Sequence, residues 1–211
     1  MLLKTLSLNL LILVSGHAWA EAVVKNVHGQ AFIKKIGDKS RGEPLKKGMK
    51  TKSSSYFRVA DHSVLTIELS DFTEVTASSQ AHFYIVEEHE HFSILLKEGT
   101  IKVKAIQRLK NQNTRKVVVK THKARVESSL GEFIVAHMPV LDHTSVYGLS
   151  GLAMFNSKQN FAKEQAIQIY EDDESELTSL LERPVSTSKI SDKKRKNLQA
   201  FFTPSKAKAK N

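Results

Sequence analysis

Two histidines in the stretch "VEEHEHF", His89 and His91, have the spacing of a pair of metal ligands. Residues two apart in a β-strand share a face, so both imidazoles could reach one zinc or copper ion. A structural zinc site needs four ligands, so the others would have to come from elsewhere in the chain. The alternative is an acidic loop between strands expected at "HFYIV" and "FSILL". We treat the pair as metal candidates only, and predict no metal site and no cofactor.

Motifs for nucleophilic catalysis are incomplete. "YGLSG" is one residue short of the G-x-S-x-G nucleophile elbow and lies between two expected strands, so a glycine turn explains it better. "STSK", at residues 186–189, matches S-x-x-K but lies in a polar linker with no helix to hold the serine over the lysine. The chain has no cysteine, which excludes thiol catalysis, Cys-zinc sites and disulfides. No phosphate-binding loop or nucleic-acid-binding motif occurs. We predict a protein that is not an enzyme and binds no nucleic acid.

The net charge of +10 is concentrated at the C-terminus, where eight basic residues and one Asp follow Ser188. There "DKKRKN" adjoins "LQAFF", which places cations beside apolar side chains. Such a segment could lie on an anionic membrane or meet lipopolysaccharide. It could equally be a solvated tail that only keeps the protein soluble. The candidate residues for anionic-surface binding are Lys193, Lys194, Arg195, Lys196, Phe201 and Phe202.

Residues 1–20 have the features of a signal peptide. An early lysine precedes an apolar run that is too short for a membrane helix, which needs about 20 residues. Ala18 and Ala20 are the small residues that a signal peptidase requires. An uncleaved membrane anchor is the alternative. We predict cleavage after Ala20 and secretion across the inner membrane, to a periplasmic or outer-envelope location.

The elements that must position any site are short strands. From residue 21 to 170 the apolar runs alternate with polar residues, and turn signals recur every 8–12 residues or so, as in a sandwich, barrel or β-roll. This predicts an all-β domain, a β-roll or β-sandwich of short strands. The phase of the alternation predicts five core residues: Leu65, Ile67, Leu69, Val103 and Phe133.

The chain changes character after Tyr170. Acidic residues crowd before Leu177 and Leu181, which suits the first turn of a short helix, so we expect an acidic helix and linker over residues 171–188. Residues 189–211 follow as a basic tail, helical near Lys193 to Phe202 and disordered after Pro204. We expect this tail to be separable from the fold.

Four segments share one design, in which a glycine is followed by an alternating strand. They are "GQAFI", "GTIKVKA", "GEFIV" and "GLAMF". Glycine permits a positive φ where a chain reverses, and the strand then buries one face. These repeats indicate architecture, with a tight turn before each strand, and supply no reaction by themselves.

Read in order, the segments resemble the FecR family, the extracytoplasmic modules of ferric-citrate transport regulators. The resemblance runs from "VHGQAFIKK" through "GEPLKKGMKTKSSSYFRVA", where Leu45 and Gly48 match the family's L-x-x-G, to "LLKEGTIKVKA" and "TSVYGLSGLAMF". Two motifs depart from it. Residues 71–73 replace the usual D-G-S, and only Gly131 and Phe133 remain of R-G-T-x-F. FecR regulators also carry a cytoplasmic anti-sigma segment and a membrane helix, whereas here a signal peptide precedes the domain.

The resemblance implies an extracytoplasmic interaction module. We therefore predict a non-enzymatic envelope module that binds a protein or a glycan in cell-surface signalling. A hydrolase of envelope carbohydrate is the first alternative, and would need two carboxylates facing one cleft. A regulator that joins a separate anti-sigma protein by strand addition at an open sheet edge is the second.

Overall fold

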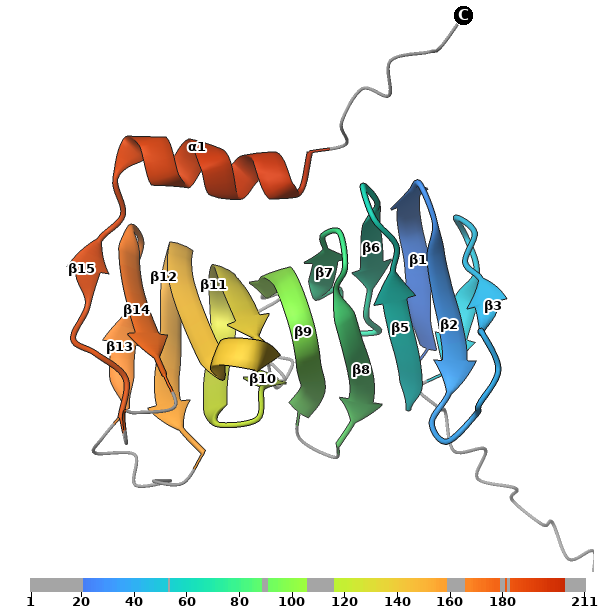
Figure 1. Cartoon of the computed structure of the whole chain (residues 1–211), viewed down its shortest axis with the longest axis horizontal. Coiled ribbons are helices and arrows are strands. Elements are labelled where there is room, and N and C mark those ends of the chain that lie inside the picture. The colour runs from blue at the N-terminus through green and yellow to red at the C-terminus, as the bar shows by residue number, and fades with distance from the viewer. Residues whose placement is uncertain are drawn as a thin grey trace, which may run out of the picture.

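The structure, a computed structural model, describes residues 21–52, 54–88, 91–105, 116–158, 166–178, 181 and 183–203. The expected signal peptide, His89 and the chain beyond Thr203 lie outside the described residues. Within these ranges the protein is mostly β-structure, followed by one α-helix near the C-terminus (Figure 1). The predicted all-β fold class is confirmed.

One continuous sheet joins fifteen strands in the described part of the chain. The elements are β1 (Glu21–His28), β2 (Ala31–Lys35), β3 (Glu43–Pro44), β4 (Lys50–Lys52), β5 (Ser55–Val59), β6 (Val64–Glu68), β7 (Glu74–Ala77), β8 (His82–Glu87), β9 (His91–Ala105), β10 (Lys116–Lys120), β11 (Ala124–Met138), a 3₁₀ turn η1 (Pro139–Leu141), β12 (His143–Ser157), β13 (Ile167–Ile169), β14 (Asp173–Leu177), β15 (Ser188–Lys189) and α1 (Asp192–Phe201).

The sheet folds over itself into two layers, because the three long strands each take part in both. The second half of β9 pairs with β7 and β11, whereas its first half pairs with β8 and β10. Likewise β12 pairs with β14 through its first half and with β13 through its second. The first layer therefore runs β4-β1-β6-β7-β9-β11-β12-β14-β15, and the second runs β3-β2-β5-β8-β9-β10-β11-β12-β13. In Figure 1, β5 and β8 lie in front of β6 and β7.

Glycines mark the places where the chain passes between layers. Gly99, Gly131 and Gly151 lie inside β9, β11 and β12, and all three have positive φ. Gly131 and Gly151 are paired across the ladder, and a Cβ on Gly131 would lie 2.3 Å from the carbonyl oxygen of Ser150. The expected tight turn before each strand is therefore wrong at these three positions. The glycine bends a strand that continues, since the same positive φ serves a bend as well as a turn.

A single hydrophobic core lies between the two layers and draws residues from nearly every strand. All five predicted core residues are buried: Leu65, Ile67, Leu69, Val103 and Phe133. A second, smaller cluster lies on the outer side of the first layer, where Ile190 and Leu198 cover Ile134 and Tyr147. This cluster attaches α1 to the sheet.

The acidic helix expected over residues 171–188 is wrong. Strand β14 occupies Asp173–Leu177 and pairs with β12 on one side and β15 on the other. The residues "DESEL" also alternate, with Asp173, Ser175 and Leu177 buried and the two glutamates turned outward. β12 pairs with residues 174–177 and β15 pairs with residues 173 and 174, so sheet pairing prevails over the local preference of acidic residues for a helix start.

Candidate functional site

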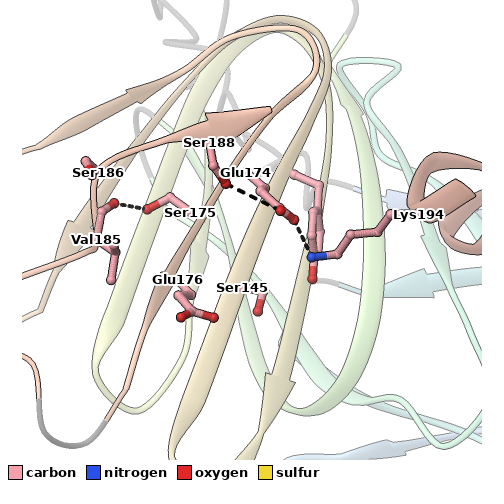
Figure 2. A pocket seen from close by; sticks show the side chains of 9 residues that line it. Ser145, Glu174, Ser175, Glu176, Val185, Ser186, Ser188 and Lys194 are labelled. Atoms are coloured by element: carbon pink, nitrogen blue, oxygen red, sulfur yellow. Dashed lines mark hydrogen bonds and ion pairs between the residues drawn. The ribbon is translucent and has the colours of Figure 1, made fainter. Parts of the chain in front are cut away.

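A polar cleft opens beside β14. It is about 180 Å³ in volume and is lined by Ser145, Tyr147, Glu174, Ser175, Glu176, Val185, Ser186, Ser188 and Lys194. These residues come from β12, β14, the segment that leads into β15, β15 itself and α1 (Figure 2). The cleft thus exists only where the C-terminal part of the chain returns to the sheet.

The alternation of β14 places both glutamates in the polar cleft. Glu174 and Glu176 are two residues apart in the strand and so project from the same face. On the edge side of β14, the Ser175 hydroxyl donates to the carbonyl of Val185, and the Val185 amide donates to the carbonyl of Glu176. These bonds hold the segment before β15 beside the strand and form the far wall of the cleft.

Glu174 is tied to α1. Its carboxylate forms an ion pair with the Lys194 ammonium and accepts a hydrogen bond from Ser188 at 3.4 Å (Figure 2). The ammonium also lies 5.1 Å from the centre of the Tyr147 ring. Burial by itself would lower the pKa of Lys194, but the hydrogen bond to Glu174 and the neighbouring charges outweigh it and raise the pKa above its ordinary value. Lys194 therefore stays charged, and its contacts with Glu174 and Tyr147 hold its side chain in the wall of the cleft.

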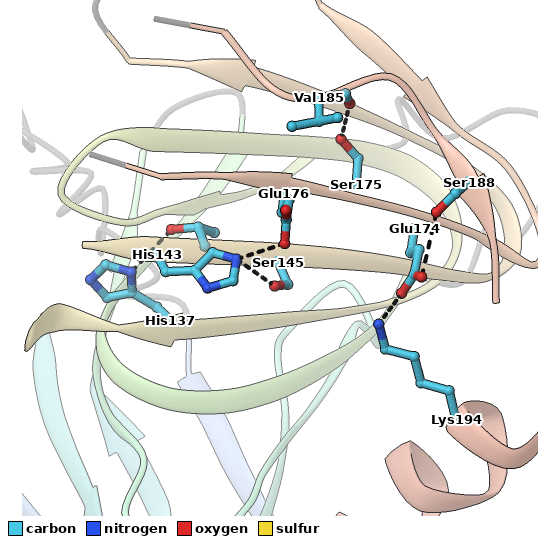
Figure 3. Close-up of polar contacts among 10 residues, drawn as sticks. His137, His143, Ser145, Glu174, Ser175, Glu176, Val185, Ser188 and Lys194 are labelled. Atoms are coloured by element: carbon cyan, nitrogen blue, oxygen red, sulfur yellow. Dashed lines mark hydrogen bonds and ion pairs between the residues drawn. The ribbon is translucent and has the colours of Figure 1, made fainter. Parts of the chain in front are cut away.

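Whereas Glu174 contacts a lysine, Glu176 contacts a histidine. Its carboxylate lies 3.1 Å from Nε2 of His143, and the Ser145 hydroxyl lies 3.2 Å from the same nitrogen (Figure 3). A Ser-His-acid triad uses the two ring nitrogens separately, one toward the serine and one toward the acid. Because both contacts here converge on Nε2, His143 cannot carry a proton from Ser145 while Glu176 orients the ring. The trio is a hydrogen-bonded cluster without triad geometry.

A second histidine, His137, belongs to a buried chain of hydroxyls. Its Nδ1 lies 3.0 Å from the hydroxyl of Thr144, which lies 3.0 Å from the hydroxyl of Thr121. Only 3% of His137 is exposed, and this burial lowers the pKa of the ring. Figure 3 shows His137 pointing away from the polar cleft. The three residues join the end of β10, just before Thr121, to β11 and β12 on the inside of the molecule.

The predicted metal candidates are only partly described. His91 begins β9, and its Nε2 lies 2.9 Å from a carboxylate oxygen of Glu88. Glu88 is further held by Lys120 and Ser93. His89 lies outside the described residues. Within the described ranges, no group of three or more His, Asp or Glu side chains gathers where a metal ion could be held.

The residues proposed for anionic-surface binding fall into two groups in the structure, those that contact the rest of the protein and those that are exposed. Lys194 forms an ion pair with Glu174 of β14, and Arg195 with Asp172 in the turn before that strand; Phe202 packs against the second cluster. Lys193, Lys196 and Phe201 are exposed. The helix expected near residues 193–202 is confirmed, with Ser191 as its N-cap. Because Ile190 and Leu198 are buried, the described part of this segment is packed on the sheet.

Sequence reasoning missed the polar cleft, although two signals for parts of it exist. The alternation in "DESEL" would have placed Glu174 and Glu176 on one face of a strand. The unbroken apolar run from Phe133 to Ala136 indicates a strand covered on both faces, here by the core and by α1. Nothing in the sequence pairs Lys194 with Glu174, because twenty residues separate them.

Of the helices in the described ranges, none combines the length and the apolar character that crossing a membrane would require.

No protein-family model and no curated protein matches the chain. Among the solved structures that match are two crystal structures, each named as a proposed anti-sigma factor from Parabacteroides distasonis. They superpose with TM-scores of 0.55 and 0.54, at 12% sequence identity in both cases. Each match covers 68% of this chain, but only 63% and 64% of the solved chains. At this identity the likeness concerns the fold alone: over about two thirds of its length, this chain has the fold of two proposed anti-sigma factors.

Proposed function

We propose that the protein is a non-enzymatic, FecR-type binding module of the bacterial cell envelope that acts in cell-surface signalling, with the polar cleft as its ligand site. The observation that carries the proposal is the cleft, where four serine residues and the two glutamates Glu174 and Glu176 line a volume of about 180 Å³. The ordered FecR-like segments and the fold shared with proposed anti-sigma factors support the signalling role.

The chemistry of the cleft suits a hydroxylated ligand such as an envelope glycan. Serine hydroxyls both donate and accept hydrogen bonds, and carboxylates accept them, which matches the hydroxyl groups of a sugar. The volume is below the ~300–1,000 Å³ of sites that enclose a whole drug-sized molecule. The cleft would therefore take one unit of a longer chain while the rest stays outside.

The arrangement of the two carboxylates favours binding over hydrolysis. Glycosidases place their acids on opposite sides of the bond to be cleaved. Glu174 and Glu176 project side by side from one strand, and Lys194 neutralises the first. Two acids do line one cleft, so hydrolysis of envelope carbohydrate is the second candidate function, and the same experiment tests it.

The experiment is a titration of the purified protein with soluble peptidoglycan fragments and lipopolysaccharide oligosaccharide, with mass spectrometry of the glycans afterwards. Ser186→Tyr fills the cleft and Glu176→Gln removes one carboxylate charge. Glu68→Gln is the matched control, since Glu68 lies on β6, several strands away in the sheet. We expect the two cleft variants to lose at least ~tenfold in affinity, about 1.4 kcal/mol, while the control binds as the wild type does.

Three other results would change the conclusion. Shortened glycans, made by the wild type and not by Glu176→Gln, would establish the hydrolase. If no glycan binds but a pull-down from envelope extract retains a protein that Ser186→Tyr releases, the cleft binds a protein. If Ser186→Tyr retains that protein, the contact lies elsewhere. A sheet edge such as β13, which pairs with β12 in the described part of the chain, would then be the place where an anti-sigma partner adds a strand.

A further inference from the structure

The β11–β12 hairpin ends in an exposed apolar point. Met138, Val140 and Leu141 are 49%, 95% and 60% exposed, and Pro139 completes the segment. We call residues 138–141 the apolar tip. Single exposed aliphatic residues are ordinary on protein surfaces, but three within four residues at the end of a hairpin form a patch that requires an explanation.

The apolar tip is held rigidly. Pro139 begins the 3₁₀ turn η1, and the backbone amide of Asp142 closes it by donating to the carbonyl of Pro139 at 3.1 Å. The Asp142 carboxylate lies 3.3 Å from the Lys123 ammonium and 3.5 Å from His122. Because these contacts constrain the backbone of the turn, its aliphatic side chains stay exposed to solvent in the unbound protein. The turn therefore loses little conformational freedom when it enters an apolar phase.

A basic cavity adjoins the apolar tip. It has a volume of about 550 Å³ and contains Pro139 of the tip in its wall. Its lining includes Lys97, Lys120, His122 and Lys158, with Asp142 as the acidic residue among the described lining residues. Lys120 is paired with Glu88, and the exposed Glu98 faces His82. Lys97 and Lys158 are exposed at the mouth of the cavity.

We propose that the apolar tip and the basic cavity dock the protein on an anionic lipid bilayer. Met138, Val140 and Leu141 would enter the boundary between headgroups and acyl chains, while Lys97 and Lys158 face the lipid phosphates. The tip projects from the end of a hairpin, so it suits a layer that it can enter. Apolar insertion next to basic side chains is the combination that binds peripheral proteins to anionic membranes.

The basic C-terminal segment fits this role less well. The ion pairs of Lys194 and Arg195 with Glu174 and Asp172 reduce its effective charge, and Leu198 and Phe202 are packed on the sheet. The tip offers both parts of a membrane contact in one place. The proposal does not depend on the polar cleft, and the two sites can be tested separately.

The test is co-sedimentation of the full-length secreted protein with vesicles of phosphatidylcholine alone or of equimolar phosphatidylcholine and phosphatidylglycerol. We expect binding to the anionic vesicles only. Val140→Glu should reduce it by about tenfold or more, the ratio expected when one aliphatic side chain can no longer be buried. The double variant Lys97→Gln/Lys158→Gln should bind more weakly and show a smaller effect of added salt.

The control is Ile36→Glu, which introduces the same charge at another exposed aliphatic residue, one preceded by two lysines. Val140 is almost fully exposed, so its substitution should leave the melting temperature unchanged. Equal losses in Val140→Glu and Ile36→Glu would mean that charge alone controls binding and would overturn the proposal. Competition by soluble glycerol phosphate at millimolar concentration would reassign the cavity to a free phosphate ligand.

Two further outcomes would also overturn it. If the wild type self-associates without lipid and Val140→Glu is monomeric, the apolar tip is an interface between copies of this chain. If the protein binds no vesicles but Val140→Glu releases a protein partner, the tip docks on protein. Ser186→Tyr should bind vesicles as the wild type does, so failure of the glycan titration and failure of the vesicle assay are distinguishable.

Discussion

His137 shows how burial controls a single titratable group. Burial disfavours the charged ring and lowers its pKa below the ordinary value of 6.5, while the backbone of His143 and the charge of Asp142 oppose the shift only in part. Burial also lowers the pKa of His82. The unfolded chain then takes up protons at a higher pH than the folded chain does. Stability is complete above about pH 6.5 and falls as the pH drops from there toward the folded pKa values.

We therefore expect the urea midpoint to fall between about pH 7.5 and pH 5.5, and His137→Gln to flatten this dependence. His62→Gln, at an exposed histidine, is the control and should leave the slope unchanged. The lowered pKa values of Glu88 and Asp173 act only at more acidic pH, below about 4.5, and so do not obscure the window. Titration of the His137 ring by NMR provides a second measurement, and a pKa above 6.5 would contradict the argument.

At the scale of elements, α1 belongs to the fold and not to a separable tail. Leu198 is 6% exposed and packs with Ile190 on Ile134 and Tyr147 of the sheet. A truncation ending at Ser188 would uncover both sheet residues and break three ion pairs, those of Lys189, Lys194 and Arg195. This packing reverses the expectation from the charge pattern. The truncated protein should melt at a lower temperature than the full chain.

Leu198→Ala should lower the unfolding free energy by about 2 kcal/mol or more, because it leaves a cavity between α1 and the sheet. Phe201→Ala is a matched control on the same helix, where the side chain is 56% exposed, and should cost under about 0.5 kcal/mol. Denaturant titration of both variants measures the difference. Equal and small losses would mean that the helix does not rest on the sheet in solution.

The bends in the long strands make a second prediction at this scale. Gly131 has a φ of +128°, and an added Cβ would meet the backbone of Ser150. Gly131→Ala should cost about 3 kcal/mol or more, from the unfavourable φ together with the clash. Gly37 also has a positive φ but open space around its Cβ position, so Gly37→Ala should cost only about 1 kcal/mol. Unfolding in urea separates the two contributions, and similar costs at both sites would show that the clash is relieved.

For the whole molecule, the prediction concerns export, because Glu21 would become the N-terminus after removal of the expected signal peptide. We predict export and cleavage after Ala20, because Ala18 and Ala20 are small and the apolar run before them is short. Intact-mass measurement of the protein recovered from the envelope should give a chain that starts at Glu21. A mass that includes Met1, in the inner-membrane fraction, would contradict both the cleavage and the proposed location.

The sequence alone determined the features that depend on neighbouring residues. Alternation placed Ile67 and Val103 on the buried side of strands, because the period of two follows from backbone geometry in any sheet. The glycines that open the four repeated segments, Gly29, Gly99, Gly131 and Gly151, all have positive φ, a conformation that glycine adopts more readily than other residues. The composition of residues 193–202 was enough to indicate a helix there, and the structure adds that Ser191 is its N-cap.

Only the tertiary structure decided which segments meet. The two-layer order depends on pairings between strands far apart in the chain, such as β7 with β9 and β12 with β14. The segment Asp173–Leu177 is a strand because β12 offers it an edge, and this partner is not visible in a local window. The same docking brings Ser145, Glu174 and Lys194 into one cleft. The pattern of residues in a sequence indicates the local preference of the backbone. A site, in contrast, is formed by contacts between distant segments, and the stability of those contacts depends on the whole fold.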